Sequence, residues 1–309
     1  MGTRGIDDIF ISDLLTGELS PFLCAVKNDR SRFALEIRGG YVSIYYKGGC
    51  LLKITRHPRK GYEFAFDSRY CLNKADTSYY ETVRTFDPYS VDTYVKELPN
   101  LISEMDSWFC EHPKPERDFQ HTLLVSNPEI IDIEYQVGNR MRLDMLAVHD
   151  EKLVVIENKY GNGAVTGSAG LAKHYADMCA VLRDSALYSD LTGSVMNIAQ
   201  AKHALGLTDR VLRRSDIADA EILFLLAGYN EKSAALSNEA AKMKRSVPAK
   251  LLLMDANESI INWGNEIPFA IKQDVPNAAT LRAMDAAEKN EDMYGPFDSV
   301  SDLIDALNV

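Results

Sequence analysis

The chain has 309 residues, of which 46% are hydrophobic and 26% charged, which is typical of a soluble globular protein with an ample core. Its net charge of −11 argues against a surface coated with nucleic acid. No apolar run approaches the ~20 residues that span a bilayer, and no basic region followed by an apolar one marks the N-terminus as an export signal. With five widely spaced cysteines and no Cys-x-x-Cys pair, these features predict a cytoplasmic protein with no membrane partner.

Residues 1–112 are predicted to form a β-rich domain. After a short helix over Asp7–Leu15, apolar runs alternate with turn signals from Phe33 onward, and this pattern predicts a four-stranded meander. The expected strands are Ala34–Arg38, Tyr41–Lys47, Leu51–Thr55 and Tyr62–Phe66. A helix over Asp87–Glu111 follows, and Pro99 inside it is expected to kink or split it.

Charge is distributed unevenly along the chain. Lys27–Lys60 contains nine Lys or Arg and two acids, whereas Asp285–Val309 contains seven acids and one Lys. Basic residues interleaved with tyrosines suit a nucleic-acid surface, because bases stack on rings while cations contact phosphates, and the candidates are Arg38, Lys53 and Arg56. The alternative, that the tyrosines pack the core of the meander, stays open. The acidic tail either is solvated, docks a partner or occupies the basic patch.

The second domain is predicted to cover residues 113–309, with its core at 113–255, because the chain breaks at His112-Pro113-Lys114-Pro115. The periodicity of its apolar residues predicts alternating helices and strands, hence an α/β fold with a mixed sheet between helices. The expected helices are Glu116–Val125, Leu171–Arg183, one or two around Val195–Leu205 and Asp209–Arg214, and Ser233–Lys244. The expected strands are Ile130–Val137, two within Met141–Tyr160, Glu221–Tyr229 and Lys250–Asp255. Short helices are expected in the acidic tail at Ala278–Lys289 and Ser301–Leu307.

The segment Met141–Tyr160 is predicted to be a buried β-hairpin that carries charge at one end. A two-residue turn at Asp150-Glu151 would set Asp144 opposite Glu157, and Lys159 would lie on the same face. Opposed side chains in such a ladder lie roughly 4.5–5.5 Å apart at Cβ, so the two carboxylates repel unless a cation, a proton or a basic neighbour compensates. A structural ion-pair cluster is the alternative, but it would contribute little stability. The pattern therefore favours a metal-dependent active site.

A helix, a three-stranded meander and a second helix, with Asp144 on the second strand and Glu157-Asn158-Lys159 on the third, resemble the PD-(D/E)XK nuclease superfamily. The resemblance implies a restriction-endonuclease-like fold and a Mg²⁺- or Mn²⁺-dependent nuclease, with DNA favoured over RNA. It implies that Asp144, Glu157 and the backbone carbonyl of Asn158 bind the metal while Lys159 orients the attacking water. Glu116 on the first helix is the candidate for a further metal contact, and Gln120, one turn later, is its alternative.

The chain also departs from the family pattern. Leu143 stands where a proline often precedes the Asp, and Leu171 stands where some branches place a Gln four residues before a Tyr. These departures leave the subfamily open. The further residues predicted to contact substrate are Arg142, Lys173, His174 and Tyr175. Arg142 could instead form an ion pair with Asp144. His174 and Tyr175 could instead have a packing or surface role.

Two other readings of the chain remain. The same fold could serve a nucleic-acid-binding protein without catalysis, although degenerate members of the superfamily typically lack one of the three motif residues. It could also serve as an interaction module of a larger defence or repair assembly. A homodimer is as compatible with the sequence as a larger assembly.

Overall fold

The computed structural model describes residues 4–71, 86–138, 141–161, 165–167, 170–229, 234–243 and 247–269. Residues Met1–Phe269 form one compact unit, and Ala270–Val309 belong to a second. The acidic tail and its two expected helices therefore lie outside the described residues. The domain boundary expected near His112 falls inside the first unit and stays a prediction.

Two helices precede the first sheet. Helix α1 (Asp8–Leu15) begins at Asp7, whose carboxylate accepts a hydrogen bond from the backbone N–H of Phe10. Helix α2 (Ser20–Asn28), which the sequence did not indicate, begins with a proline in its first turn. Their rings pack on the sheet, since Phe10 contacts Tyr62 at 4.9 Å between centroids. No single described helix is long and apolar enough to cross a membrane, although α1 and α2, bent by 65°, meet that criterion as a pair.

The predicted meander is confirmed, with small shifts at the strand ends. Strands β1 (Phe33–Ile37), β2 (Tyr41–Tyr46), β3 (Gly49–His57) and β4 (Gly61–Ala65) form an antiparallel sheet in chain order. Tyr45, Tyr46 and Tyr62 are buried, so these three rings pack the core. A 3₁₀ turn, η1 (Ser68–Tyr70), follows the sheet.

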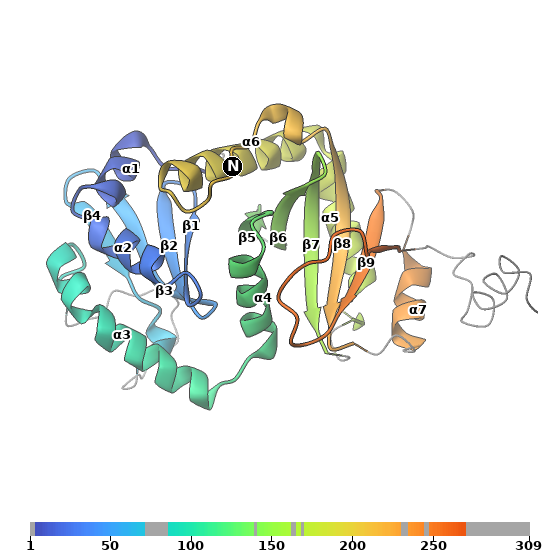
Figure 1. Cartoon of the computed structure of the whole chain (residues 1–309), viewed down its shortest axis with the longest axis horizontal. Coiled ribbons are helices and arrows are strands. Elements are labelled where there is room, and N and C mark those ends of the chain that lie inside the picture. Colours follow the sequence, from blue (N-terminus) through green and yellow to red (C-terminus); the bar gives the residue numbers. More distant parts are fainter. Residues whose placement is uncertain are drawn as a thin grey trace, which may run out of the picture. The chain divides into compact units, whose positions relative to one another are not determined.

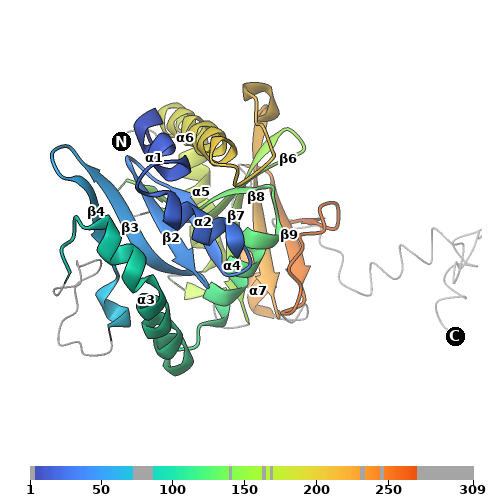
Figure 2. The ribbon, with the colours of Figure 1, turned by 60° about the vertical axis from the view of Figure 1, so that its left-hand side comes forward.

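Helix α3 (Val91–Glu111) lies beside β3 and β4 (Figure 2). Pro99 stands inside this helix, which runs as one element from Val91 to Glu111. Of the predicted kink or split, the split is therefore wrong, and the kink stays a prediction. A proline removes one intrahelical donor, but the apolar stripe of α3, including Tyr94, Leu101 and Met105, is buried on both sides of Pro99. This packing holds the two halves as one helix.

The remaining described elements form an α/β layer in the predicted order. They are α4 (Pro115–Ser126), β5 (Ile130–Val137), β6 (Met141–His149), β7 (Lys152–Tyr160), α5 (Leu171–Arg183), α6 (Ser185–Ala204), η3 (Arg214–Asp216), β8 (Asp219–Ala227), α7 (Ala234–Lys242), β9 (Ala249–Met254) and β10 (Ile267–Pro268). The sheet order is β10-β9-β8-β7-β6-β5, in which β7, β8 and β9 are parallel and the other neighbours antiparallel. The prediction of a mixed sheet flanked by helices is confirmed.

The helix expected over Asp209–Arg214 is absent from the structure. Helix α6 is longer than expected and ends at Ala204; Gly206, two residues later, has a φ of +65° and donates to the carbonyl of His203. The backbone N–H of Arg210 then bonds to the side chain of Thr208, so this segment is an irregular loop up to η3.

The hairpin of β6 and β7 has the predicted register over most of its length. Asp150 and Glu151 occupy a two-residue turn with φ values of 48° and 58°, and Leu146 pairs with Val155. The regular ladder ends one pair earlier than expected, at Met145 and Ile156.

The two faces of the hairpin are covered by different helices. Ile156 belongs to the same core cluster as Phe119 of α4, whereas Glu157, on the other face, contacts His174 of α5. The sheet therefore lies between α4 and α5, and its charged end is flanked by both.

Buried ion pairs join the two sheets. Asp132 on β5 binds Arg38, at the end of β1, and Arg4, each at 2.5 Å. Helix α6 contacts both β1 and β5 (Figure 1). Its Lys202 amine lies 2.8 Å from the Glu36 carboxylate.

Candidate active site

The end of the β6–β7 hairpin brings together the predicted catalytic side chains. Glu157 and Lys159 point to one face of β7, and Lys159 Nζ lies 2.7 Å from Glu157 Oε1. The Asp144 carboxylate accepts a hydrogen bond of 3.1 Å from the backbone N–H of Asn158, the residue between them. Asp144 lies one residue beyond the last ladder pair, Met145 and Ile156, and its carboxylate reaches the backbone of β7. The carboxylates and the amine are thus neighbours without Asp144 and Glu157 being paired in the ladder.

The site is buried, and burial shifts its ionisation. Glu157 is 1% exposed and Lys159 7% exposed, whereas Asp144 is half-buried. Burial and the neighbouring Glu157 charge raise the pKa of Asp144 to about 7. Burial also raises the pKa of Glu157, although Lys159 acts against this shift. Burial alone would lower the pKa of Lys159, but the two carboxylates outweigh it and raise that pKa. The arrangement is a crowded pair of acids with one compensating cation.

Helix α5 contributes one of its three predicted residues to the site. His174 Nδ1 lies 3.3 Å from Glu157 Oε1, and burial and Lys159 lower the pKa of this histidine. Lys173 is exposed and pairs with Asp177 at 2.5 Å. Tyr175 is buried, and its hydroxyl donates to the backbone carbonyl of Val247.

Helix α4 approaches the site from the opposite face. Gln120 donates from its side-chain amide to the backbone carbonyl of Asp144 at 3.1 Å. Glu116 is exposed, yet it is near enough for its charge to raise the pKa of Glu157. The sequence named Gln120 as an alternative metal contact but did not indicate that it holds the strand carrying Asp144. That contact could not be read from spacing alone because it joins a helix to a backbone atom.

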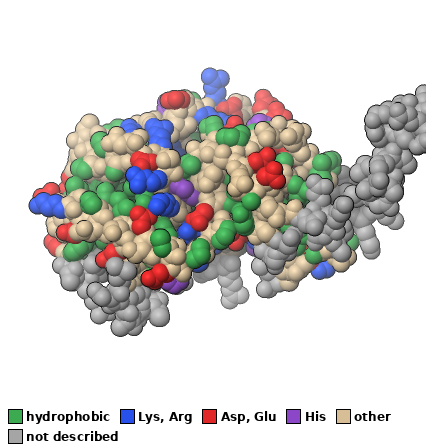
Figure 3. Space-filling model, turned by 60° about the horizontal axis from the view of Figure 1, so that its bottom comes forward, with side chains coloured by type: hydrophobic (Ala, Val, Ile, Leu, Met, Phe, Trp, Pro, Cys, Tyr) green, Lys and Arg blue, Asp and Glu red, His purple; other side chains and the backbone are tan. Residues whose placement is uncertain are grey.

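Of the other predicted substrate residues, Arg142 is near enough to this cluster for its charge to lower the pKa of Glu157, whereas Lys53 and Arg56 belong to the first sheet and Arg38 directly follows its strand β1. Arg142 is exposed and approaches Glu134 at 3.4 Å. Arg38 is buried against Asp132, whereas Lys53 lies over the ring of Tyr41 and Arg56 pairs with Asp7 on the first sheet. On the face in Figure 3, basic and acidic side chains are interspersed rather than gathered by sign. A role in substrate binding stays a prediction for each of them.

The donor set fits a hard divalent cation. Among the described residues, no group of three or more His, Cys, Asp and Glu side chains is gathered for a metal. Mg²⁺, however, commonly takes only one or two carboxylates and completes its shell with water and other oxygens. Glu157 Oε1 is buried beside the Lys159 amine at 2.7 Å and His174 Nδ1 at 3.3 Å. Asp144 and Glu157 thus offer oxygens whose mutual repulsion a cation would relieve.

Comparisons of the chain with protein-family models, with curated proteins and with solved structures each find no match.

Proposed function

We propose that the chain is a metal-dependent phosphodiesterase, a DNA endonuclease of the PD-(D/E)XK type with a restriction-endonuclease-like fold. One observation carries the proposal: Asp144, Glu157 and Lys159 meet at one end of the central hairpin, where the Lys159 amine lies 2.7 Å from the buried Glu157 carboxylate. Such a cluster contributes little to stability, whereas hydrolysis of a phosphodiester needs this set of groups. DNA as substrate and a cytoplasmic location belong to the proposal and rest on the resemblance and on the cysteine pattern.

In this mechanism Asp144, Glu157 and the carbonyl of Asn158 would hold Mg²⁺ or Mn²⁺, with Glu116 as a further contact. When bound, the cation would supply Lewis acidity to the phosphoryl oxygens and acidify a bound water. Lys159, one residue beyond Asn158, would hold the attacking water and offset the negative charge that builds up on the phosphate.

Two side chains would keep these groups in place. Gln120 holds the backbone of Asp144 from α4, and His174 faces the Glu157 carboxylate from α5. Each contact comes from a helix on a different face of the sheet, so the hairpin end is fixed from both sides.

The test is cleavage of supercoiled plasmid, single-stranded DNA and RNA in Mg²⁺, in Mn²⁺ and in EDTA. The wild type is expected to cut DNA only with a divalent cation. Lys159→Ala is expected to lose cleavage by at least about 100-fold, because it removes charge stabilisation at the reacting phosphate, while DNA binding in EDTA stays the same. Lys152→Ala, on the same strand and paired with Glu221, is the matched control and should cut normally. Full cleavage by the folded Lys159→Ala protein would refute the assignment.

A non-catalytic nucleic-acid-binding module is the second candidate. It is favoured by the ion pair between Lys159 and Glu157, which engages the amine that catalysis would use. Such a module should bind DNA equally well with and without EDTA and should cut none of the three substrates.

A further inference from the structure

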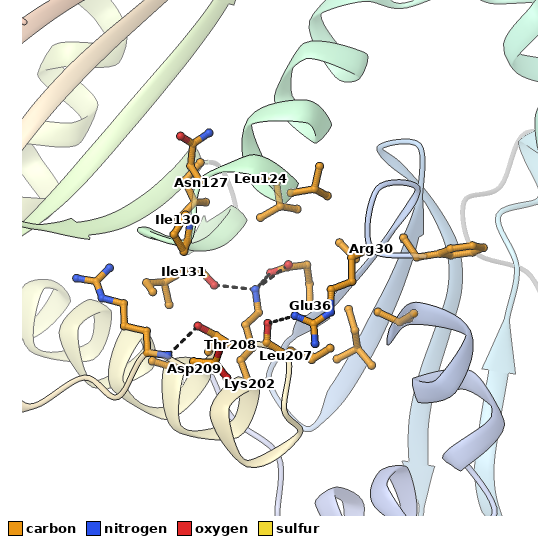
Figure 4. A pocket seen from close by; sticks show the side chains of 18 residues that line it. Arg30, Glu36, Leu124, Asn127, Ile130, Ile131, Lys202, Leu207, Thr208 and Asp209 are labelled. Atoms are coloured by element: carbon orange, nitrogen blue, oxygen red, sulfur yellow. Dashed lines mark hydrogen bonds and ion pairs between the residues drawn. The ribbon is translucent and has the colours of Figure 1, made fainter. Parts of the chain in front are cut away.

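A second cavity lies where the two sheets meet, away from the proposed active site. Its volume is about 350 Å³, within the range of about 300–1,000 Å³ typical of small-molecule sites. It is lined by the C-terminal part of α4, the beginning of β5, strand β1, helix α6 and the irregular loop after α6 (Figure 4). The side chains of the active site do not line it.

Most of the wall is apolar. Val26, Phe33, Leu35, Leu124 and Ile130 contribute side chains from α2, β1, α4 and β5. Such a wall favours an apolar or aromatic body over a free inorganic ion, because transfer of apolar surface out of water is favourable.

The charged groups of the cavity do not cancel. Lys202 is fully engaged, since its amine binds both Glu36 oxygens and the carbonyl of Ile131 (Figure 4). Arg30 donates to the carbonyls of Gly206 and Leu207, which carry no net charge (Figure 4). With Arg210, three cations line the cavity against two acids, Glu36 and the exposed Asp209.

Arg210 has a hydrogen-bond donor for which the described residues supply no acceptor. Its Nη1 is buried without a hydrogen-bond partner among them. Burial lowers the pKa of its guanidinium, and the charges of Glu129 and Asp216 only partly offset this. A buried guanidinium nitrogen without an acceptor is costly, and a carboxylate or phosphate supplies two acceptors in the matching geometry.

We infer that this cavity is a binding site for a small organic anion, whose apolar or aromatic body lies on the α4–β1 wall and whose carboxylate or phosphate binds Arg210. The inference does not depend on the nuclease assignment, because none of the proposed metal ligands lines the cavity.

The probes are two anions, adenosine 5′-monophosphate and benzoate. Adenosine and inorganic phosphate, the two parts of adenosine monophosphate, are the controls. Titration calorimetry on the full chain in EDTA should show binding of at least one of the two anions, and weaker or no binding of adenosine and phosphate. Binding of adenosine monophosphate alone would identify the phosphate class, and binding of benzoate alone the carboxylate class. If neither anion binds at millimolar concentration, or if adenosine binds as well as its monophosphate and benzoate does not bind, the inference is wrong.

Variants locate the site. Arg210→Gln should weaken binding of the anion at least about tenfold, the loss expected for one charge-assisted contact. Arg213→Gln, an exposed arginine of the same loop, and Lys159→Ala in the active site should bind as the wild type does. Hydrogen exchange on the wild type gives a readout that needs no variant: the bound anion should protect amides within residues 207–211. Unchanged exchange there, or equal effects of Arg210→Gln and Arg213→Gln, would place the anion elsewhere and overturn the inference.

Discussion

At the scale of single residues, the ionisation state of Asp144 distinguishes a metal-binding site from a structural ion pair. Asp144 and Glu157 share a buried corner with one amine and one histidine. In the folded protein without metal, a proton retained on Asp144 relieves the repulsion between the two carboxylates. A divalent cation would take the place of that proton, so metal binding and protonation are coupled.

This coupling gives a prediction about pH. The pKa of Asp144 is about 7 in the folded protein and 3.8 for an ordinary Asp. Between about pH 4 and 7 the folded state retains a proton that the unfolded chain has lost, so the free energy of unfolding should fall as pH rises through this window. In EDTA at pH 8, Asp144→Asn should therefore be more stable than the wild type, by on the order of 1–4 kcal/mol.

Denaturant unfolding at several pH values measures this effect. Asp150→Asn in the exposed turn is the control and should follow the wild-type pH profile. Added Mg²⁺ should stabilise the wild type at pH 8 and not Asp144→Asn. If Asp144→Asn is the less stable protein at pH 8 in EDTA, the carboxylate is held by its neighbours as a structural ion.

The adjacent residues Lys173 and His174 give a second contrast at this scale. His174 contacts Glu157, whereas Lys173 is exposed and pairs within its own helix. His174→Ala should lower the rate of Mg²⁺-dependent DNA cleavage by about 10- to 100-fold, because the Glu157 carboxylate loses a neighbour that positions it. Lys173→Ala should change the rate less than about threefold, in keeping with an exposed pair. Equal losses in both variants would mean that α5 contacts the substrate along its exposed face rather than through Glu157.

At the scale of elements, helix α4 is held against the first sheet by the turn between β2 and β3. Gly48 in that turn has a φ of +76°, and a Cβ there would lie 2.9 Å from the backbone oxygen of Arg117. Gly40, in the preceding turn, has the same φ but open space around it. Alanine substitution at each glycine therefore distinguishes the free-energy cost of a left-handed backbone from the cost of a steric clash with α4.

Gly40→Ala should lower the free energy of unfolding by about 1–2 kcal/mol, the cost of a left-handed alanine. Gly48→Ala should lower it by about 1–3 kcal/mol more, because the backbone of α4 must also move. Since Gln120 on α4 holds the strand of Asp144, Gly48→Ala should also reduce cleavage, and Gly40→Ala should not. Urea unfolding and plasmid cleavage measure the two effects, and equal destabilisation by both variants would show that α4 does not depend on this turn.

The elements that could be predicted from sequence are those whose signals are local. The order of helices and strands from α4 to β9, and the register of the hairpin, follow from apolar periodicity and from the two-residue turn at Asp150. Helix α2 and the full length of α6 did not follow. The buried face of α6 includes the polar residues Thr192 and Ser194, which weaken its apolar stripe. In the site, Lys159 and Glu157 share a face by strand alternation alone. The hydrogen bond from the backbone N–H of Asn158 to Asp144 could not be predicted. It depends on where the β6–β7 ladder ends, and no local sequence signal marks that position.

At the scale of the whole described unit, the two sheets are joined by charges rather than by an apolar seam alone. Asp132 is fully buried and binds Arg4 and Arg38, while Glu36 binds Lys202. Arg38, whose predicted role in substrate binding stays a prediction, is buried in this contact between the sheets. A buried pair of this kind adds little net stability, yet removal of one partner leaves a buried charge uncompensated.

Asp132→Ala should therefore be among the most destabilising single changes in the chain. This change leaves the buried guanidinium groups of Arg4 and Arg38 without their carboxylate partner. We expect a loss of about 3–5 kcal/mol in the free energy of unfolding. Asp177→Ala removes an aspartate from an exposed pair within α5 and should cost about 0.3–0.5 kcal/mol. Urea unfolding followed by circular dichroism measures both, and the wild type should unfold in one transition if the charges couple the sheets. A loss below about 1 kcal/mol for Asp132→Ala, or two separate transitions in the wild type, would show that the sheets are stable without this contact.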